Sequence, residues 1–296
     1  MHARLLLDPP AGGAWNMAVD EALIDAAAAE GAPLVLRFYA WTPATLSLGY
    51  FQQAAERMHH RPSLRCPLVR RASGGGAIVH DRELTYSLVV PAGHRLARET
   101  AGLYRALHGA LAEVLAEWGV VGKMFRCGEC EVEGDADVDQ GHAPHPSPLP
   151  QGEGARRVSP LPVGEGPGVR DGDAAKPVNP RATPDTFLCF QRRGEGDLVV
   201  TGAKIAGSAQ RRRHGAVLQH GSVLLARSEA APELPGLAEL ADQTIDADQL
   251  RERWLARLAA QLELEFAPSA LTDAERETAV ELQRAKYSAA EWTYRR

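Results

Sequence analysis

A segment rich in proline and glycine interrupts this chain and limits what the rest of it can fold into. From about Glu131 to Pro184 the apolar periodicity of the flanking sequence stops, and SPLPQGEG at Ser147 is nearly repeated as SPLPVGEG at Ser159. Repeated proline and glycine support neither helix nor sheet and bury little apolar surface. We therefore expect a disordered insertion at about 131–184, with the fold built from the two flanking parts of the chain.

The composition of the 296 residues is typical of a globular protein. Hydrophobic residues make up 45% and charged residues 24%, and the net charge of −5 argues against a general nucleic-acid binder. No apolar run approaches the roughly 20 residues that span a membrane. The start, MHARLLLDPPAGGAW, does not resemble a signal peptide because Asp8 and two prolines end its apolar run. Four cysteines in a chain of this length do not suggest a disulfide framework. We expect a reduced, cytoplasmic protein with neither nucleic-acid nor membrane partners.

Helices and hairpins alternate irregularly along the two flanking parts. Helical spacing is present in NMAVDEALIDAAAAEG, in ETAGLYRALHGALAEVLAEWG, and in two C-terminal stretches that start at Asp246 and Thr272. Strands are predicted in PLVLRFYAW, TLSLGYF and GAVLQHGSVLL, with a hairpin in DLVVTGAKIAGSAQ that turns at Thr201-Gly202. We predict an α+β fold with a mixed, largely antiparallel sheet flanked by helices. Residues 1–245 form the main domain, interrupted by the insertion, and residues 246–296 form a helical segment packed on it.

Three consecutive glycines, Gly74–Gly76, lie between two apolar β runs in RRASGGGAIVHD. Glycine allows backbone amides to approach a ligand closely, and successive amides can hold an anion or a carbonyl oxygen. The stretch lacks the lysine and the spacing of a P-loop. A β-bulge would explain the glycines alone equally well, but with Arg70, Arg71 and His80 beside them they become a candidate binding loop.

A thiol and an amine lie fifteen residues apart in CFQRRGEGDLVVTGAKIAGSAQ, at Cys189 and Lys204. The thiolate is the attacking form of cysteine, and a nearby ammonium stabilises it. The structural alternatives are a buried small cysteine and a surface lysine. If both lie on neighbouring strands, their side chains can meet. Cys127 and Cys130 form a single CxxC without a visible second pair, so we predict no metal site, and Cys66 is expected in the core.

Three stretches in order resemble the lipoate/biotin protein ligase and octanoyltransferase superfamily. They are LRFYAWTPATLSLGYFQ, RRASGGGAIVHDRELTYSLVV and GAKIAGSAQRRRHGAVLQHGSVLL, and the resemblance runs from Gly13 to about Leu225, apart from the insertion. It implies a fold like the catalytic domains of biotin and lipoate ligases. HDRELTYS stands where the ligases usually carry a GN.N.S pattern, and CF at Cys189 stands where they tend to carry Arg-Asn-Asp. The resemblance is therefore closer to the cysteine-dependent octanoyltransferases.

That resemblance implies an acyltransferase of lipoate biosynthesis that works without ATP, metal or other cofactor. Its donor would be octanoyl-acyl carrier protein, and its acceptor a lysine of a lipoyl domain or of glycine cleavage H protein. The implied catalytic pair is Cys189 and Lys204. Three alternatives stay open: an ATP-dependent lipoate–protein ligase, a lipoyl-domain amidotransferase, and a non-catalytic lipoyl-domain-binding protein.

The expected substrate-binding residues come from the glycine loop and from the stretch after Lys204. They are Arg71, Ser73, Gly74, Gly75, Gly76, His80, Gly207, Ser208, Gln210 and His220. The amides of Gly74–Gly76 and of Gly207-Ser208 are candidates for holding a developing oxyanion. For His80 and His220, a structural role in which both rings are hydrogen-bonded inside the protein fits the sequence as well as substrate binding does.

Overall fold

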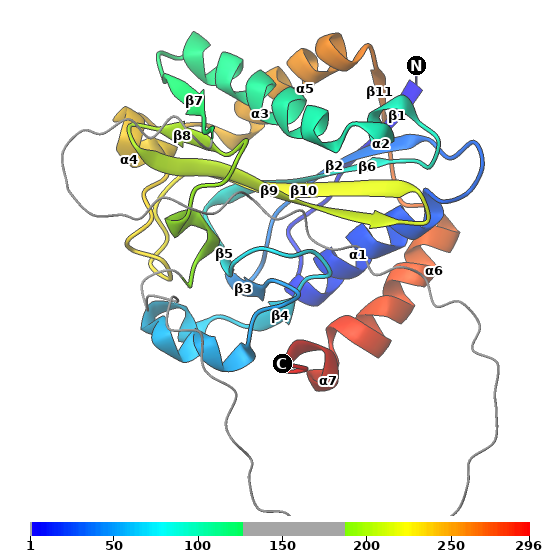
Figure 1. The fold of residues 1–296 in the computed structure, drawn as a ribbon, viewed down its shortest axis with the longest axis horizontal. Helices are drawn as coiled ribbons and strands as arrows, with labels where there is room; N and C mark the ends of the chain where they lie inside the picture. The colour runs from blue at the N-terminus through cyan, green and yellow to red at the C-terminus, as the bar shows by residue number, and fades with distance from the viewer. Residues whose placement is uncertain (1, 127–186) are drawn as a thin grey trace, which may run out of the picture. The chain divides into compact units, whose positions relative to one another are not determined.

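The computed structural model describes residues 2–126 and 187–296 (Figure 1). These residues belong to one compact unit, Met1–Glu129 together with Thr183–Arg296. The predicted insertion at about 131–184 lies outside the described residues, as does the CxxC motif at Cys127 and Cys130.

One large sheet organises the described part of the chain. Its eight strands lie in the order β11-β1-β2-β6-β10-β9-β8-β7, and a smaller sheet has the order β4-β3-β5. Strand β1 pairs in parallel with β11 and β2, and every other neighbouring pair in the large sheet is antiparallel. The sheet is therefore mixed and largely antiparallel, which confirms the predicted fold class. The strands are β1 (His2–Leu7), β2 (Leu34–Tyr39), β3 (Thr45–Leu48), β4 (Leu68–Arg70), β5 (Ile78–His80), β6 (Glu83–Val90), β7 (Gly122–Met124), β8 (Leu198–Val200), β9 (Ala203–Arg213), β10 (Ala216–Leu224) and β11 (Glu265–Ser269).

Helices cover both faces of the large sheet, as Figure 1 shows. The helices α3 (Thr100–Glu117) and α5 (Ala247–Leu262) lie on one face, and α1 (Gly13–Ala26) and α6 (Asp273–Leu282) lie on the other. None of the helices in the described ranges is long and apolar enough to cross a membrane. The shorter elements are α2 (Arg95–Arg98), α4 (Leu237–Ala241), α7 (Ala290–Thr293), the 3₁₀ turns η1 (Ala54–His59), η2 (Arg61–Arg65) and η4 (Cys189–Gln191), and the π-helical turn η5 (Gln283–Tyr287).

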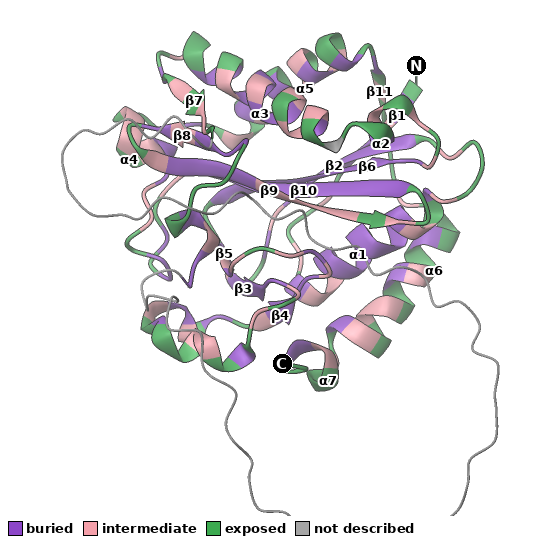
Figure 2. Cartoon of the chain, in the orientation of Figure 1, coloured by how far each residue is buried: buried purple, intermediate pink, exposed green. Residues whose placement is uncertain are grey.

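Alternation along the central strands divides the core into two layers. Leu36 and Phe38 of β2 pack with the α3 and α5 side, whereas Val35 and Tyr39 pack toward α1. Trp254 of α5 is fully buried and meets the Phe38 ring edge-on at 5.8 Å between centroids. Figure 2 shows β10 buried along its length, so the site described below is built on a strand inside the core.

The hairpin of β8 and β9 turns where the sequence predicts it. Thr201 and Gly202 have φ angles of 44° and 84°. Positive φ at both central residues is the geometry that matches the twist of two-residue hairpins. The turn places Lys204 at the second position of β9, opposite Val199 of β8.

The prediction of an entirely helical C-terminal segment from Asp246 was partly wrong. The helix α6 begins as expected, with Thr272 and Glu275 forming a capping box. Helix α5 ends before Glu263, which has a φ of 56°, and Glu265–Ser269 form strand β11. This strand pairs with β1, so the edge of β1 supplies its hydrogen-bond partners, and Pro268 is incompatible with a continued helix. The sequence analysis predicted neither strand.

Candidate active site

The glycine loop between β4 and β5 is in direct contact with the segment that carries Cys189. The Cys189 amide donates to the Ala77 carbonyl at 2.7 Å, and the Ala77 amide donates to Phe187 at 3.2 Å. A Cβ atom at Gly76 would lie 3.0 Å from the Cys189 Cα, so a side chain there would push the two segments apart. Cys189 starts the turn η4 rather than lying on a strand, and it is half-buried.

Lys204 reaches Cys189 from β9. Its Nζ lies 3.6 Å from the Cys189 Sγ and 3.5 Å from the Cys189 carbonyl oxygen. The same Nζ forms an ion pair with Asp197 Oδ2 at 2.8 Å, and both side chains are buried. A Cβ atom at Gly207 would lie 2.5 Å from the Lys204 Cε, so the missing side chain at Gly207 makes room for the ammonium. The arrangement holds a fixed positive charge beside the thiol, where it stabilises a thiolate.

Asp197 is a site residue that the sequence analysis missed. It precedes β8, and the irregular register between Leu198 and Val199 brings it alongside Lys204 across the hairpin. A buried ammonium needs a partner of opposite charge. The acid that directly precedes the first hairpin strand, in GEGDLVV, is the signal that could have identified it.

Two cavities meet at Cys189. The inner cavity holds about 480 Å³ and the outer one about 1120 Å³, both values including space open to solvent. Among the described residues, Gly75, Cys189 and Ser208 line both cavities. The inner cavity is mainly apolar, and its lining includes Met17, Tyr39, Trp41, Ile78, Phe190 and Ala209. The outer cavity is more polar, and its lining includes Gln52, Tyr104, Arg193, Glu195, Asp197 and Lys204.

Arg71 holds the glycine loop in place. Its guanidinium donates to the carbonyl oxygens of Gly74 at 2.9 Å and Gly76 at 2.7 Å, and to the carbonyl and hydroxyl oxygens of Ser47. Burial lowers the Arg71 pKa to about 10, at which the side chain stays charged near neutral pH. Both terminal nitrogens of the guanidinium donate within the protein, while the buried Nε has no partner, so Arg71 shapes the loop beside the inner cavity through its two terminal nitrogens.

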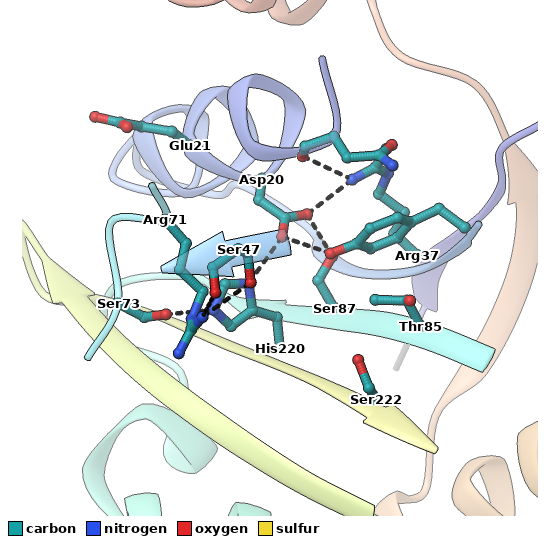
Figure 3. Close-up of polar contacts among 12 residues, drawn as sticks. Asp20, Glu21, Arg37, Ser47, Arg71, Ser73, Thr85, Ser87, His220 and Ser222 are labelled. Carbon is teal, nitrogen blue, oxygen red and sulfur yellow. Dashed lines mark hydrogen bonds and ion pairs between the residues drawn. The ribbon is translucent and has the colours of Figure 1, made fainter. Parts of the chain in front are cut away.

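His220 is hydrogen-bonded at both ring nitrogens, as Figure 3 shows. Its Nε2 lies 2.5 Å from the Ser73 Oγ, and its Nδ1 lies 3.0 Å from the Asp20 Oδ2. Burial alone would raise the Asp20 pKa, but the His220 hydrogen bond and the charge of Arg37 at 2.9 Å outweigh it and lower the pKa. Ser73 is thus anchored behind the inner cavity rather than lining it.

His80, which also lines the inner cavity, is held in a similar way. Its Nδ1 lies 2.5 Å from the Glu83 Oε1, its Nε2 lies 2.8 Å from the Ser47 Oγ, and its ring stacks on Trp41 at 3.8 Å. Burial lowers the His80 pKa, which favours a neutral ring. Both predicted histidines therefore have structural partners and also line the inner cavity.

The residues expected after Lys204 divide into two groups. Gly207 and Ser208 lie at the site, and the Ser208 Oγ contacts the Tyr86 hydroxyl and the His108 Nε2 at 2.5 and 2.6 Å. Gln210 lies further along β9, donates to the Gln219 Oε1 at 2.7 Å, and lines neither of these two cavities.

The free cysteine Cys66 lies in the small hydrophobic core beside the three-stranded sheet, as predicted, where burial raises its pKa. Within residues 2–126 and 187–296, no group of three His, Cys, Asp or Glu side chains is placed to hold a metal ion.

Comparisons with known proteins extend over nearly the whole chain. The lipoyl protein ligase A/B catalytic domain model matches residues 13–135 and 181–232. Octanoyltransferase LipM of Kyrpidia tusciae is 32% identical over 99% of this chain and 98% of its own length, and octanoyltransferase LipM of Brevibacillus brevis is 30% identical over 96% and 95%. The solved bipartite lipoate protein ligase with its E2 lipoyl domain from Thermoplasma acidophilum has the same fold, with a TM-score of 0.65, 20% identity, and coverage of 99% of this chain and 96% of that one.

Proposed function

Because the chain belongs to the lipoyl protein ligase A/B catalytic domain family and matches octanoyltransferases over nearly its whole length, we propose that it transfers octanoyl groups in lipoate biosynthesis through a thioester on Cys189. The matches at 32% and 30% identity confirm the octanoyltransferase activity predicted from the sequence. The thioester rests on one observation, the 3.6 Å contact between the Lys204 Nζ and the Cys189 Sγ.

In the first half-reaction, the Cys189 thiolate attacks the carbonyl carbon of the donor thioester. The new carbon–sulfur bond forms on Sγ, the bond to the donor sulfur breaks, and the departing thiolate takes a proton from solvent in the outer cavity. The Lys204 ammonium favours the attacking thiolate, and its ion pair with Asp197 keeps the charge in place. One thioester replaces another, so the step needs no ATP.

The two cavities suit the two parts of the substrates, the acyl chain and the group that carries or receives it. The apolar lining of the inner cavity suits an eight-carbon acyl chain, with the thioester carbonyl at Cys189. The open, polar outer cavity gives access to the arm of the donor and then to the acceptor lysine. The backbone amides of Gly75 and Gly76, which line the outer cavity beside Cys189, are the proposed donors to the developing oxyanion.

For the donor we propose octanoyl-acyl carrier protein, and for the acceptor a lysine of a lipoyl domain or of glycine cleavage H protein. The acceptor is supported by the family and by the similar fold of the bipartite lipoate protein ligase from Thermoplasma acidophilum, which is described together with its E2 lipoyl domain. A free nucleophilic thiol must stay reduced, as it does in the cytoplasm, which is the location we propose.

Incubation with octanoyl-acyl carrier protein, without ATP, tests the proposal. Mass spectrometry should find one octanoyl adduct that maps to Cys189 and is released by hydroxylamine. Cys189→Ser should lose both the adduct and transfer, whereas Cys66→Ser, a matched control in the small core, should keep them. Full transfer by Cys189→Ser would overturn the thioester and favour an ATP-dependent ligase. Exclusive use of an octanoylated lipoyl domain as donor would instead identify an amidotransferase.

A further inference from the structure

A buried chain of hydroxyl and imidazole groups ends at the junction of the two cavities. The Tyr86 hydroxyl lies 2.5 Å from the Ser208 Oγ, the Ser208 Oγ lies 2.6 Å from the His108 Nε2, and the His108 Nδ1 lies 2.5 Å from the Gly196 carbonyl oxygen. Tyr86 and His108 are fully buried, on β6 and α3. Ser208 alone among the residues described at the junction bears a hydroxyl.

The hydrogen-bond partners determine which way the protons point. A carbonyl oxygen only accepts, so the His108 Nδ1 must carry a hydrogen that it donates to Gly196. In the neutral ring the Nε2 is then an acceptor, and the Ser208 hydroxyl donates to it. The Nε2 lies closer to the Ser208 Oγ than to the Tyr86 hydroxyl, which is 3.2 Å away. With the Ser208 hydrogen directed to the Nε2, the Tyr86 hydroxyl is the donor of the 2.5 Å contact, and the Ser208 Oγ keeps one lone pair for a donor in the cavity.

Several charged and titratable groups surround the His108 ring. Tyr86 faces it from β6, Tyr104 lies one helical turn before it with ring centroids 6.2 Å apart, and the charges of Asp197 and Lys204 act on it from opposite sides of the hairpin. Burial, the largest influence, lowers the His108 pKa, so the ring is neutral near neutral pH and its Nε2 has a lone pair for a proton.

The second half-reaction needs a group that can accept a proton. When an amine attacks a thioester it must lose a proton, whereas a thiolate acceptor has none to lose. The Lys204 Nζ is already engaged by the buried Asp197 at 2.8 Å and by the Cys189 Sγ at 3.6 Å, so the Ser208 Oγ is the group at the junction with a lone pair facing the cavity. We propose that Ser208, backed by His108, takes the proton that the acceptor lysine releases, a role that rests on the proposed thioester mechanism.

The neutral acceptor amine attacks the carbonyl carbon of the octanoyl thioester, and its nitrogen passes one proton to the Ser208 Oγ as the Ser208 proton moves to the His108 Nε2. The carbon–nitrogen bond is retained, the bond to Sγ breaks, and Cys189 leaves as a thiolate beside the Lys204 ammonium. His108 is left as an imidazolium and returns its proton to solvent when the product departs.

The test starts from enzyme already acylated on Cys189 and compares two acceptors. A lipoyl domain offers an amine, and holo-acyl carrier protein offers a thiol. In Ser208→Ala, transfer to the lipoyl domain should slow by about 10²–10⁴-fold, the usual contribution of positioned proton transfer, while return to the thiol keeps its wild-type rate. Ser208→Thr, which restores a hydroxyl, should recover amine transfer.

His108→Gln and a control variant complete the design. His108→Gln should slow amine transfer and remove the fall in its rate as pH drops below the ordinary histidine pKa of 6.5, because no ring remains to be protonated. Ser63→Ala is the control, since Ser63 is also a buried serine bonded to a histidine, His60 at 2.9 Å, and lines neither cavity.

The outcomes separate this inference from the proposed function. Wild-type amine transfer in Ser208→Ala, or equal slowing with both acceptors, would overturn the proton-accepting role while leaving the thioester intact. If wild-type enzyme forms no acyl-Cys189 at all, the proposed function itself is wrong.

Discussion

Replacing Gly207 by alanine should move the Lys204 ammonium away from the Cys189 thiol without unfolding the protein. The added Cβ would lie 2.5 Å from the Cε and 2.8 Å from the Nζ of Lys204. Non-bonded carbon atoms normally stay about 3.5–4 Å apart, so the end of the lysine side chain must move by about 1 Å. The atoms that clash belong to the end of a flexible side chain, which makes the movement inexpensive for folding.

The electrostatic loss follows from the distance. At an effective dielectric constant of about 20, two unit charges at the observed 3.6 Å attract by about 4.6 kcal/mol, and at about 4.6 Å by about 3.6 kcal/mol. The difference of about 1 kcal/mol is about fivefold in thiolate stabilisation. A misplacement of about 1 Å at a reacting centre can cost about 100-fold. We therefore expect Gly207→Ala to slow acylation by between about 5-fold and 100-fold.

Rapid-quench mass spectrometry of acyl-enzyme formation under single-turnover conditions measures this rate. Gly109→Ala is the control, because a Cβ at Gly109 on helix α3 meets nothing within 4 Å. Urea unfolding of both variants checks that the fold is retained. If Gly207→Ala acylates as fast as the wild type, the position of Lys204 does not govern the thiol, and the catalytic pair is refuted.

Lys204, Arg71 and the two buried histidines each give a measurable expectation. Lys204→Met should slow acylation by up to about 2 × 10³-fold, the factor that corresponds to losing the whole attraction of about 4.6 kcal/mol. Adding Asp197→Asn should recover stability in urea unfolding but not the rate, and recovery of the rate would contradict the charge role. A single ammonium in Arg71→Lys cannot bond both Ser47 of β3 and the carbonyl oxygens of the glycine loop as the two terminal nitrogens of Arg71 do. It should therefore destabilise the protein by at least the roughly 1.5–3 kcal/mol of one charge-assisted hydrogen bond, with a matching fall in the urea midpoint. Because burial lowers the pKa values of His80 and His108, the unfolded chain takes up protons first; stability should be complete above pH 6.5 and fall below it by up to about 1.4 kcal/mol per pH unit for each ring, and a flat urea-unfolding profile there would contradict this.

The local elements of this protein could be predicted from the sequence because their signals lie within a few residues of each other. The hairpin turn at Thr201-Gly202 and the capping box at Thr272 are set by backbone preferences and short-range hydrogen bonds. The glycine loop and the Cys189–Lys204 pair were also found from their motifs, and the structure places them together.

Contacts between distant segments were decided by the tertiary structure alone. Strand β11 exists because β1 offers a parallel edge, and no local pattern encodes an edge so far away in the chain. The Asp197 partner of Lys204 depends on an irregular strand register.

The sequence by itself determined which residue types could perform thiol chemistry and which stretches form the strands and turns that carry them. Only packing decided which of these side chains meet. Tyr86, His108 and Ser208 come from three separate elements and converge within hydrogen-bonding distance, whereas Gln210, two residues after Ser208 on the same strand, is bonded to Gln219 away from both cavities. The physical reason is that propensities act along the chain, while a site is assembled from side-chain directions and registers that become defined when the sheet and its helices close on a common core.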